Sequence, residues 1–275
     1  MEKILVIVTH HDPKNAKYLR VVVDRLLRQE GRGIEFCLDI NVVSTEYQSY
    51  GKDLMETHDI RFHFQDFFAH PDLSNATKKG NWAIENIMEY FHDRVLFCSD
   101  DVYPALNAIK TMLEEPKNTI VNIMSNSDIG GLVRFPLSIP NSLSLEDLPE
   151  EHVKALDGPT PGLPLTVLVP MVPFFFTMLG REVIESVGYL NNDLDAAGND
   201  MEYCHRARAK GVPVVLSFKS LVIHFNGKTL KHTTTEEQRM LSMSDAHAEI
   251  YGRFILRKGI RKECQSSPQT TESKT

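Results

Sequence analysis

The stretch Val95-Leu96-Phe97-Cys98-Ser99-Asp100-Asp101 runs from four apolar residues directly into a polar turn with two adjacent carboxylates. A short apolar run bounded by turn residues is typical of a strand that is covered on both faces. The same pattern opens the chain, where Thr9 follows the run Ile4 to Val8. Ligands of open α/β sheets bind beyond the carboxyl ends of the strands, so these strand ends are the first candidates for a functional edge.

The residues that follow Thr9 predict a helix and a second strand. Apolar residues recur at helical spacing over residues 15–29, and Gly31 ends this pattern. Residues 34–38 predict a second strand that ends at Asp39. A strand, a helix and a strand in this order predict parallel neighbours. We therefore expect Thr9, Asp39 and the Asp100–Asp101 pair to converge on one edge of the sheet.

The rest of the chain continues the alternation of helices and strands. Further helices are predicted over residues 81–91, 104–113, 181–187, 200–210 and 235–257, and further strands over residues 95–98, 167–179, 214–218 and 221–224. Residues 41–77 show weak periodicity and receive no assignment, whereas residues 132–164 predict a long loop over the site. This alternation predicts an α/β fold with a mostly parallel central sheet flanked by helices.

Composition narrows the class of protein. The chain has 275 residues and a net charge of −7, which gives no general attraction to nucleic acid or to an anionic membrane. Its four cysteines include no Cys-x-x-Cys pair, and three prolines interrupt the longest apolar run, residues 163–179. We therefore expect a reduced, cytoplasmic protein without a transmembrane segment. The chain has no P-loop, no Gly-x-Ser-x-Gly elbow and no Gly-x-Gly-x-x-Gly after the first strand.

Adjacent carboxylates at a strand end suit a hard divalent cation, Mn²⁺ or Mg²⁺, that is shared with a nucleotide diphosphate. The alternative for Asp100 and Asp101 is an exposed acidic turn that caps the next helix, and for a bare Asp-Asp pair this is the commoner case. Thr9 and Asp39 have the same alternative as turn residues. The context of the pair has to decide between the two interpretations.

Three segments supply that context: VLFCSDDVYP at residues 95–104, EVIESVGYLNNDLDAAGNDMEYCHRARAKGVPV at residues 182–214 and SLVIHFNGKT at residues 220–229. Their order and spacing resemble an inverting family 2 glycosyltransferase over roughly residues 3–230. The resemblance implies a GT-A, Rossmann-like nucleotide-binding fold. It implies a domain over residues 1–230, with residues 1–130 as the nucleotide-sugar half and 131–230 as the acceptor-binding and catalytic half. We expect a helical extension over residues 231–262 and a disordered tail over residues 263–275.

The resemblance also implies roles for individual residues. Asp101 matches the direct metal ligand, and His224 matches a histidine that completes the metal or diphosphate site. Asp200 matches the general base that opens the later helix. The residues implied in nucleotide-sugar binding are Thr9, His11, Asp39, Lys79, Asp100 and Lys228.

Two positions depart from the family pattern. Ser99 stands where the first aspartate of the Asp-x-Asp motif is usual, and Asn199 stands where a glutamate usually precedes the base. The predicted function is metal-dependent, inverting transfer of a sugar from a nucleotide donor, with a UDP-sugar favoured, to an acceptor hydroxyl. The alternative is a nucleotide-sugar binding protein of the same fold with weakened catalysis. The acceptor stays open between a glycan, a lipid-linked sugar, a protein, a small molecule and a nucleic-acid base.

Overall fold

The computed structural model of the chain describes residues 1–10, 16–44, 49–58, 60–64, 76–126, 145, 148, 150–157, 165–192, 194 and 198–225. Its strands are β1 Glu2–His10, β2 Phe36–Ser44, β3 Ile60–Phe64, β4 Arg94–Ser99, β5 Val102–Pro104, β6 Ile120–Ser125, β7 Thr166–Leu168, β8 Phe176–Gly180 and β9 Val214–His224. Its helices are α1 Ala16–Leu27, α2 Ser49–Thr57, α3 Ala76–Asn86, α4 Ala108–Leu113, α5 Glu150–Asp157, α6 Arg181–Val187 and α7 Asn199–Ala209.

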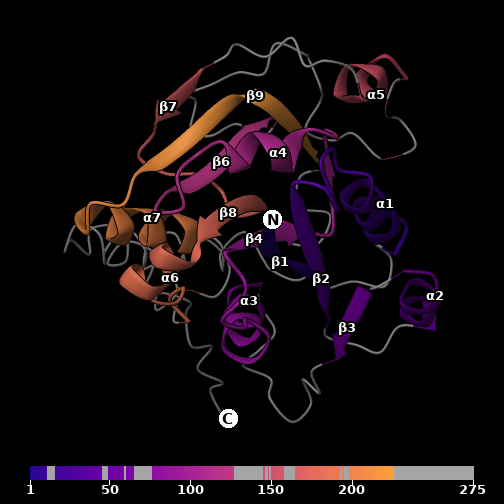
Figure 1. Cartoon of the computed structure of the whole chain (residues 1–275), viewed down its shortest axis with the longest axis horizontal. Coiled ribbons are helices and arrows are strands. Elements are labelled where there is room, and N and C mark those ends of the chain that lie inside the picture. The colour runs from indigo at the N-terminus through magenta and orange to yellow at the C-terminus, as the bar shows by residue number, and fades with distance from the viewer. Residues whose placement is uncertain are drawn as a thin grey trace, which may run out of the picture.

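The strands form one mixed sheet in the order β3-β2-β1-β4-β8-β6-β9-β5, and β7 pairs with β9 off this path (Figure 1). Strands β3, β2, β1 and β4 are parallel, and so is the pair β6–β9. Strands β5, β7 and β8 run antiparallel to their neighbours. The predicted α/β architecture, with a large central sheet flanked by helices, is confirmed. Six of the nine strands run in one direction, and these three strands enter the sheet in the opposite sense.

Alternate residues of the central strands enter two different cores. Ile4, Val6 and Val8 pack with α1 and α4, whereas Leu5 and Ile7 pack on the opposite face with α3, α6 and α7. All five side chains are fully buried. Burying an aliphatic side chain of this size contributes about 1.5–3 kcal/mol, so β1 anchors both helical layers. The helices accordingly lie on both sides of the sheet (Figure 1).

The second strand lies later in the chain than predicted. Gly31 and Gly33 adopt left-handed backbone conformations (φ 83° and 78°), and they turn Ile34 outward, where it is 84% exposed. The strand begins only at the buried Phe36 and continues to Ser44. The predicted end of this strand at Asp39 is therefore wrong.

Other boundaries also differ from the predictions. Helix α3 covers residues 76–86 rather than 81–91, and Phe91 lies under the Lys3 ammonium, 4.5 Å from the ring centroid. Strand β6 and helix α5 were not predicted, and α5 lies in the segment expected to be a loop. The strand predicted over residues 167–179 is two strands, β7 and β8. Strand β9 is continuous where two strands were predicted, and its register against β6 shifts after Ile123. The predicted helix at 235–257 and the tail at 263–275 lie outside the described residues.

Among the residues that the structure describes, no helix combines the length and the apolar character that crossing a membrane requires.

Candidate active site

The carboxyl ends of β1 and β4 and the end of β9 supply the polar residues of the candidate site. Thr9 on β1 pairs with Ser99 on β4, and the next two residues, Asp100 and Asp101, form the turn into β5. Strand β9 runs antiparallel to β5, with His224 opposite Val102. The backbone N–H of Phe225 donates to the Asp101 carbonyl at 2.9 Å. This pairing brings the predicted metal ligands together from positions more than one hundred residues apart.

Asp101 and His224 form the pair best suited to a divalent cation. His224 Nε2 lies 3.2 Å from Asp101 Oδ1, and the side chains are 15% and 4% exposed. Two neighbouring ligands of an octahedral cation, each about 2.1 Å from the metal, lie roughly 3 Å apart. The 3.2 Å between the two atoms is compatible with two adjacent positions around Mn²⁺ or Mg²⁺. Within the described ranges no group of three or more His, Cys, Asp and Glu side chains is placed to hold a metal.

The backbone and ring of His224 are held from two sides. The Asn126 side chain accepts from the His224 N–H at 2.7 Å and donates to the His224 carbonyl at 3.0 Å, as a neighbouring strand would. The Phe175 ring stacks on the imidazole, with centroids 4.3 Å apart and planes at 18°. The sequence predictions did not include Asn126. Its only sequence signal is an amide that directly follows the apolar run of β6.

Asp100 faces inward, toward a histidine and a lysine. It is 1% exposed, and its Oδ2 lies 2.5 Å from His10 Nδ1. An ionised carboxylate only accepts hydrogen bonds, so His10 Nδ1 is the donor when Asp100 is ionised. Lys79 Nζ donates to the His10 carbonyl at 2.9 Å. Burial lowers the pKa of Lys79 to about 7, and the nearby Asp100 carboxylate opposes that shift.

The predicted residues Thr9, Lys79, Asp100, Asp101 and His224 therefore gather at one edge of the sheet. His10 joins them, although His11 was the member of the pair that was predicted. His11 and Lys228 lie outside the described residues.

Asp39 is not at this edge. It pairs with Leu5, four residues before Thr9 on β1, which corresponds to roughly 13 Å along the strand. Its carboxylate instead accepts from His92 Nε2 at 3.1 Å and from Asn41 Nδ2 at 3.0 Å. The placement expected for Asp39 was wrong because β2 extends five residues further than predicted.

Asp200 lies in the first turn of α7, which begins after Gly198 in a left-handed conformation (φ 87°). The Met201 N–H donates to Asp200 Oδ1 at 2.8 Å. Burial raises the pKa of Asp200, and this hydrogen bond acts in the opposite direction. The following turn of α7 packs into the core that it shares with α3 and α6, where the Tyr203 ring meets Phe174 with centroids 5.6 Å apart.

Comparison of the chain with protein-family models and with curated protein sequences gives no match. Solved structures do resemble it. GalNAc-T7, in a crystal structure with UDP, GalNAc and Mn²⁺, is 10% identical at a TM-score of 0.56, over 96% of this chain and 55% of that one. The mannosyltransferase PcManGT from Pyrobaculum calidifontis, with GDP-Man and Mn²⁺, is 13% identical at a TM-score of 0.56, over 97% of this chain and 76% of that one. The chain has the GT-A fold.

Staphylococcus aureus TarS shares the fold at 13% identity and a TM-score of 0.53, over 96% of this chain and 42% of that one. The chain thus spans about half the length of TarS and of GalNAc-T7. At identities this low, the structural similarity establishes the shared fold alone.

Proposed function

We propose that the chain is a metal-dependent, inverting glycosyltransferase that moves a sugar from a nucleotide donor to an acceptor hydroxyl. One observation carries the proposal: a carboxylate and an imidazole, Asp101 and His224, lie 3.2 Å apart at the ligand-binding edge of a GT-A sheet. Mn²⁺ or Mg²⁺ is the cofactor that these two donors suit. A bound divalent cation neutralises the charge that grows on the leaving diphosphate.

The solved structures of the same fold support this donor class. GalNAc-T7 is seen with UDP, GalNAc and Mn²⁺, TarS with UDP, and PcManGT with GDP-Man and Mn²⁺. UDP occurs in two of these three proteins, so we favour a UDP-sugar. The acceptor remains open between the classes that the sequence allows.

Asp200 is the proposed general base. As the acceptor oxygen forms its bond to the anomeric carbon, the bond from that carbon to the diphosphate oxygen breaks, and its electron pair leaves with the diphosphate. Asp200 takes the proton of the attacking hydroxyl. Its raised pKa suits that task, because a more basic carboxylate is a better proton acceptor.

The other residues predicted to bind the nucleotide-sugar differ in how close they lie to the cluster at the strand ends. Thr9 and Lys79 lie in the cluster at the strand ends, and we propose that they bind the nucleotide-sugar. Asp100 belongs to the same cluster, but its bond to His10 favours a role in holding the turn that carries Asp101. His11 and Lys228 stay predictions, and the position of Asp39 in mid-strand supports no donor contact.

The first test is the metal ligand. Asp101→Ala should abolish Mn²⁺-dependent binding of UDP, because one of the two protein ligands is lost. Calorimetric titration with UDP, in Mn²⁺ and in EDTA, measures this. Asp24→Ala is the control, since Asp24 is an exposed carboxylate on α1 that pairs only loosely with Arg28 at 3.3 Å. An Asp101→Ala protein with unchanged Mn²⁺-dependent affinity would contradict the site.

The second candidate function is nucleotide-sugar binding without transfer. Ser99 and Asn199 favour it, since each replaces a carboxylate that the family pattern expects. The two functions separate in one experiment: incubation with UDP-sugars and Mn²⁺, followed by measurement of free UDP. Binding with no release of UDP to any acceptor or to water would favour the binding protein.

A further inference from the structure

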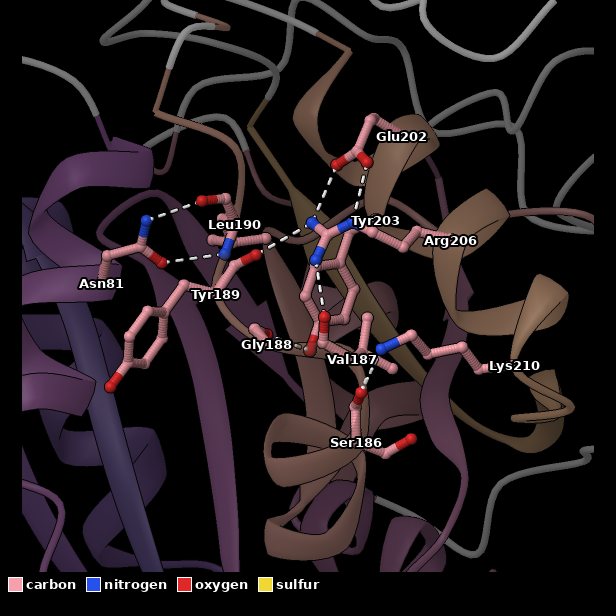
Figure 2. Close-up of polar contacts among 10 residues, drawn as sticks. All are labelled: Asn81, Ser186, Val187, Gly188, Tyr189, Leu190, Glu202, Tyr203, Arg206 and Lys210. Carbon is pink, nitrogen blue, oxygen red and sulfur yellow. Dashed lines mark hydrogen bonds and ion pairs between the residues drawn. The ribbon is translucent and has the colours of Figure 1, made fainter.

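The turn between α6 and α7 is held by an unusually complete set of hydrogen bonds. Five successive carbonyls, from residue 186 to residue 190, each accept a hydrogen bond from a side chain (Figure 2). Arg206 and Tyr203 of α7, and Lys210 directly after it, donate to the first four, and Arg206 donates to two of them, at 2.7 and 2.8 Å. The carbonyls at the end of a helix lack partners within the helix, so these contacts replace water at the end of α6.

Arg206 is itself held in place by an acidic partner. Glu202, one turn earlier on α7, contacts its Nε at 2.8 Å and its Nη2 at 2.9 Å (Figure 2). This paired arrangement fixes the guanidinium plane, so its two bonds to the turn have defined directions. The turn is therefore held against α7.

The fifth carbonyl belongs to Leu190, and it is bound from another part of the fold. Asn81 on α3 donates to the Leu190 carbonyl at 2.8 Å and accepts from the Leu190 N–H at 2.9 Å (Figure 2). Its amide also donates to Asn192 Oδ1 at 2.7 Å. Asn81 is only 3% exposed. A buried amide with all of these partners ties α3 to the turn in a single geometry.

The hydrogen bonds continue from this turn toward the proposed base. The Leu194 N–H donates to the Asn191 carbonyl at 3.3 Å. The Asn199 side chain in turn donates to the Leu194 carbonyl. Asn199 directly precedes Asp200, so the turn held by Asn81 is connected through described contacts to the start of α7.

Helix α3 also reaches the donor side of the site. Lys79, two residues before Asn81, bonds to the His10 carbonyl beside Asp100. Gly80 lies against Phe97 so closely that a Cβ there would sit 2.7 Å from the ring. Consecutive residues of α3 thus contact the end of β1, the strand β4 and the turn before Asp200.

We propose that Asn81 is a positioning residue for sugar transfer, which fixes the turn before Asp200 relative to the helix that carries Lys79. The proposal rests on the proposed function. Asn81 touches neither the metal pair nor the base, so it acts through the turn. Its loss should misplace the base relative to the bound donor and leave donor binding intact. A misplacement of about 1 Å is enough to slow a reaction on the order of a hundredfold.

The test compares Asn81→Ala with wild type in steady-state transfer and in Mn²⁺-dependent UDP titration. We expect kcat to fall at least tenfold, with KM for the nucleotide-sugar and the UDP affinity within twofold of wild type. Asn81→Asp keeps the acceptor for the Leu190 N–H and loses both donated bonds. Its kcat should therefore lie between those of wild type and Asn81→Ala. Asn86→Ala is the matched control, because Asn86 on the same helix makes an exposed local bond to the Trp82 carbonyl. Its kcat should equal that of wild type.

Asn192→Ala tests the same set of hydrogen bonds with a milder change, in case the Asn81 variants fail to fold. Asn192 is exposed, and its loss removes only one of the three bonds of Asn81. We expect a smaller fall in kcat with the same unchanged UDP affinity. Full kcat in Asn81→Ala, or parallel losses of kcat and UDP affinity in all three variants, would overturn the positioning role alone. A wild-type chain that transfers sugar from no nucleotide donor would overturn the proposed function itself.

Discussion

Two features of the surroundings of Asp200 shift the pKa of its carboxyl group in opposite directions. Burial favours the protonated acid, whereas the Met201 N–H and the start of α7 favour the carboxylate. Burial dominates, and the pKa of Asp200 is raised. For a base that accepts a proton from a hydroxyl, a raised pKa strengthens the driving force and also restricts activity to the pH range in which the group is ionised.

Asp200→Asn should retain Mn²⁺-dependent UDP binding and lose transfer by a factor on the order of 10²–10⁴. In wild type, kcat/KM should fall as the pH drops through the raised pKa of Asp200. The acid limb should therefore lie at higher pH than an ordinary aspartate would give. A pH–rate profile of wild type, together with single-pH assays of the variant, measures both effects. Glu182→Gln, at an exposed position in the first turn of α6, is the control. Full activity in Asp200→Asn would remove its role as base.

At the residue scale, the sequence was informative where an apolar strand runs directly into polar residues. That pattern indicated Asp101, the family resemblance added His224, and the structure places the two side by side. It did not locate the bond between His10 and Asp100, which are 90 residues apart. That contact depends on the register of β1 against β4, and no local pattern in the sequence encodes a register between distant strands.

At the scale of the element, β2 shows why Asp39 was misplaced. Asp39 accepts from His92 and Asn41, and Arg61 lies 3.9 Å away. His92 Nδ1 accepts from the Glu89 N–H at 2.9 Å, so the proton of the neutral ring is on Nε2 and points at Asp39. The hydrogen bond from His92 lowers the pKa of Asp39 more than burial raises it. This carboxylate ties β2 to the segment that leads into β4.

Asp39→Ala should therefore lower the free energy of unfolding by about 1–3 kcal/mol at neutral pH, since it leaves buried donors without an acceptor. A lowered pKa stabilises the fold above the unfolded pKa of the group, and this stability is lost as the pH falls through the folded value. The difference between variant and wild type should thus shrink in acid. Urea unfolding at neutral and acid pH measures it, with Asp24→Ala expected within about 0.5 kcal/mol of wild type. If Asp39→Ala instead left the stability unchanged and weakened UDP binding, Asp39 would belong to the donor site.

The predicted boundaries of helices and strands were wrong where tertiary contacts override the local pattern of apolar residues. A continuous apolar run located β1 and helical spacing located α1, and both elements bury apolar side chains in the core. It placed the end of α3 too late because Phe91 continues the apolar spacing, although this ring packs under Lys3 outside the helix. In sequence, an aromatic ring that packs against a surface lysine is indistinguishable from one that is buried in a core.

At the scale of the whole molecule, β8 is the strand that joins the two halves of the sheet. It runs antiparallel between β4 and β6, and it leads directly into α6. This insertion brings α6 and α7 onto the same face as α3, where the three helices share one core. The alternation of helices and strands predicted the layers correctly. The position of β8 follows from pairings with β4 and β6 across 55 to 86 residues (122 to 177 and 94 to 180), which the alternation does not specify.

Ligand binding should stabilise this whole unit, since the proposed site draws residues from β1, α3, β4 and β9. A ligand at one hundred times its dissociation constant adds about 2.7 kcal/mol. For a protein of this size, that corresponds to a rise in Tm of roughly 5–10 °C. Thermal unfolding with UDP and Mn²⁺ should show this rise, and UDP in EDTA should show much less, because the diphosphate then lacks the cation held by Asp101 and His224. Replacing UDP by GDP in the same scan distinguishes the two donor classes seen in proteins of this fold. Equal shifts with Mn²⁺ and with EDTA would show that nucleotide binding does not require the metal pair.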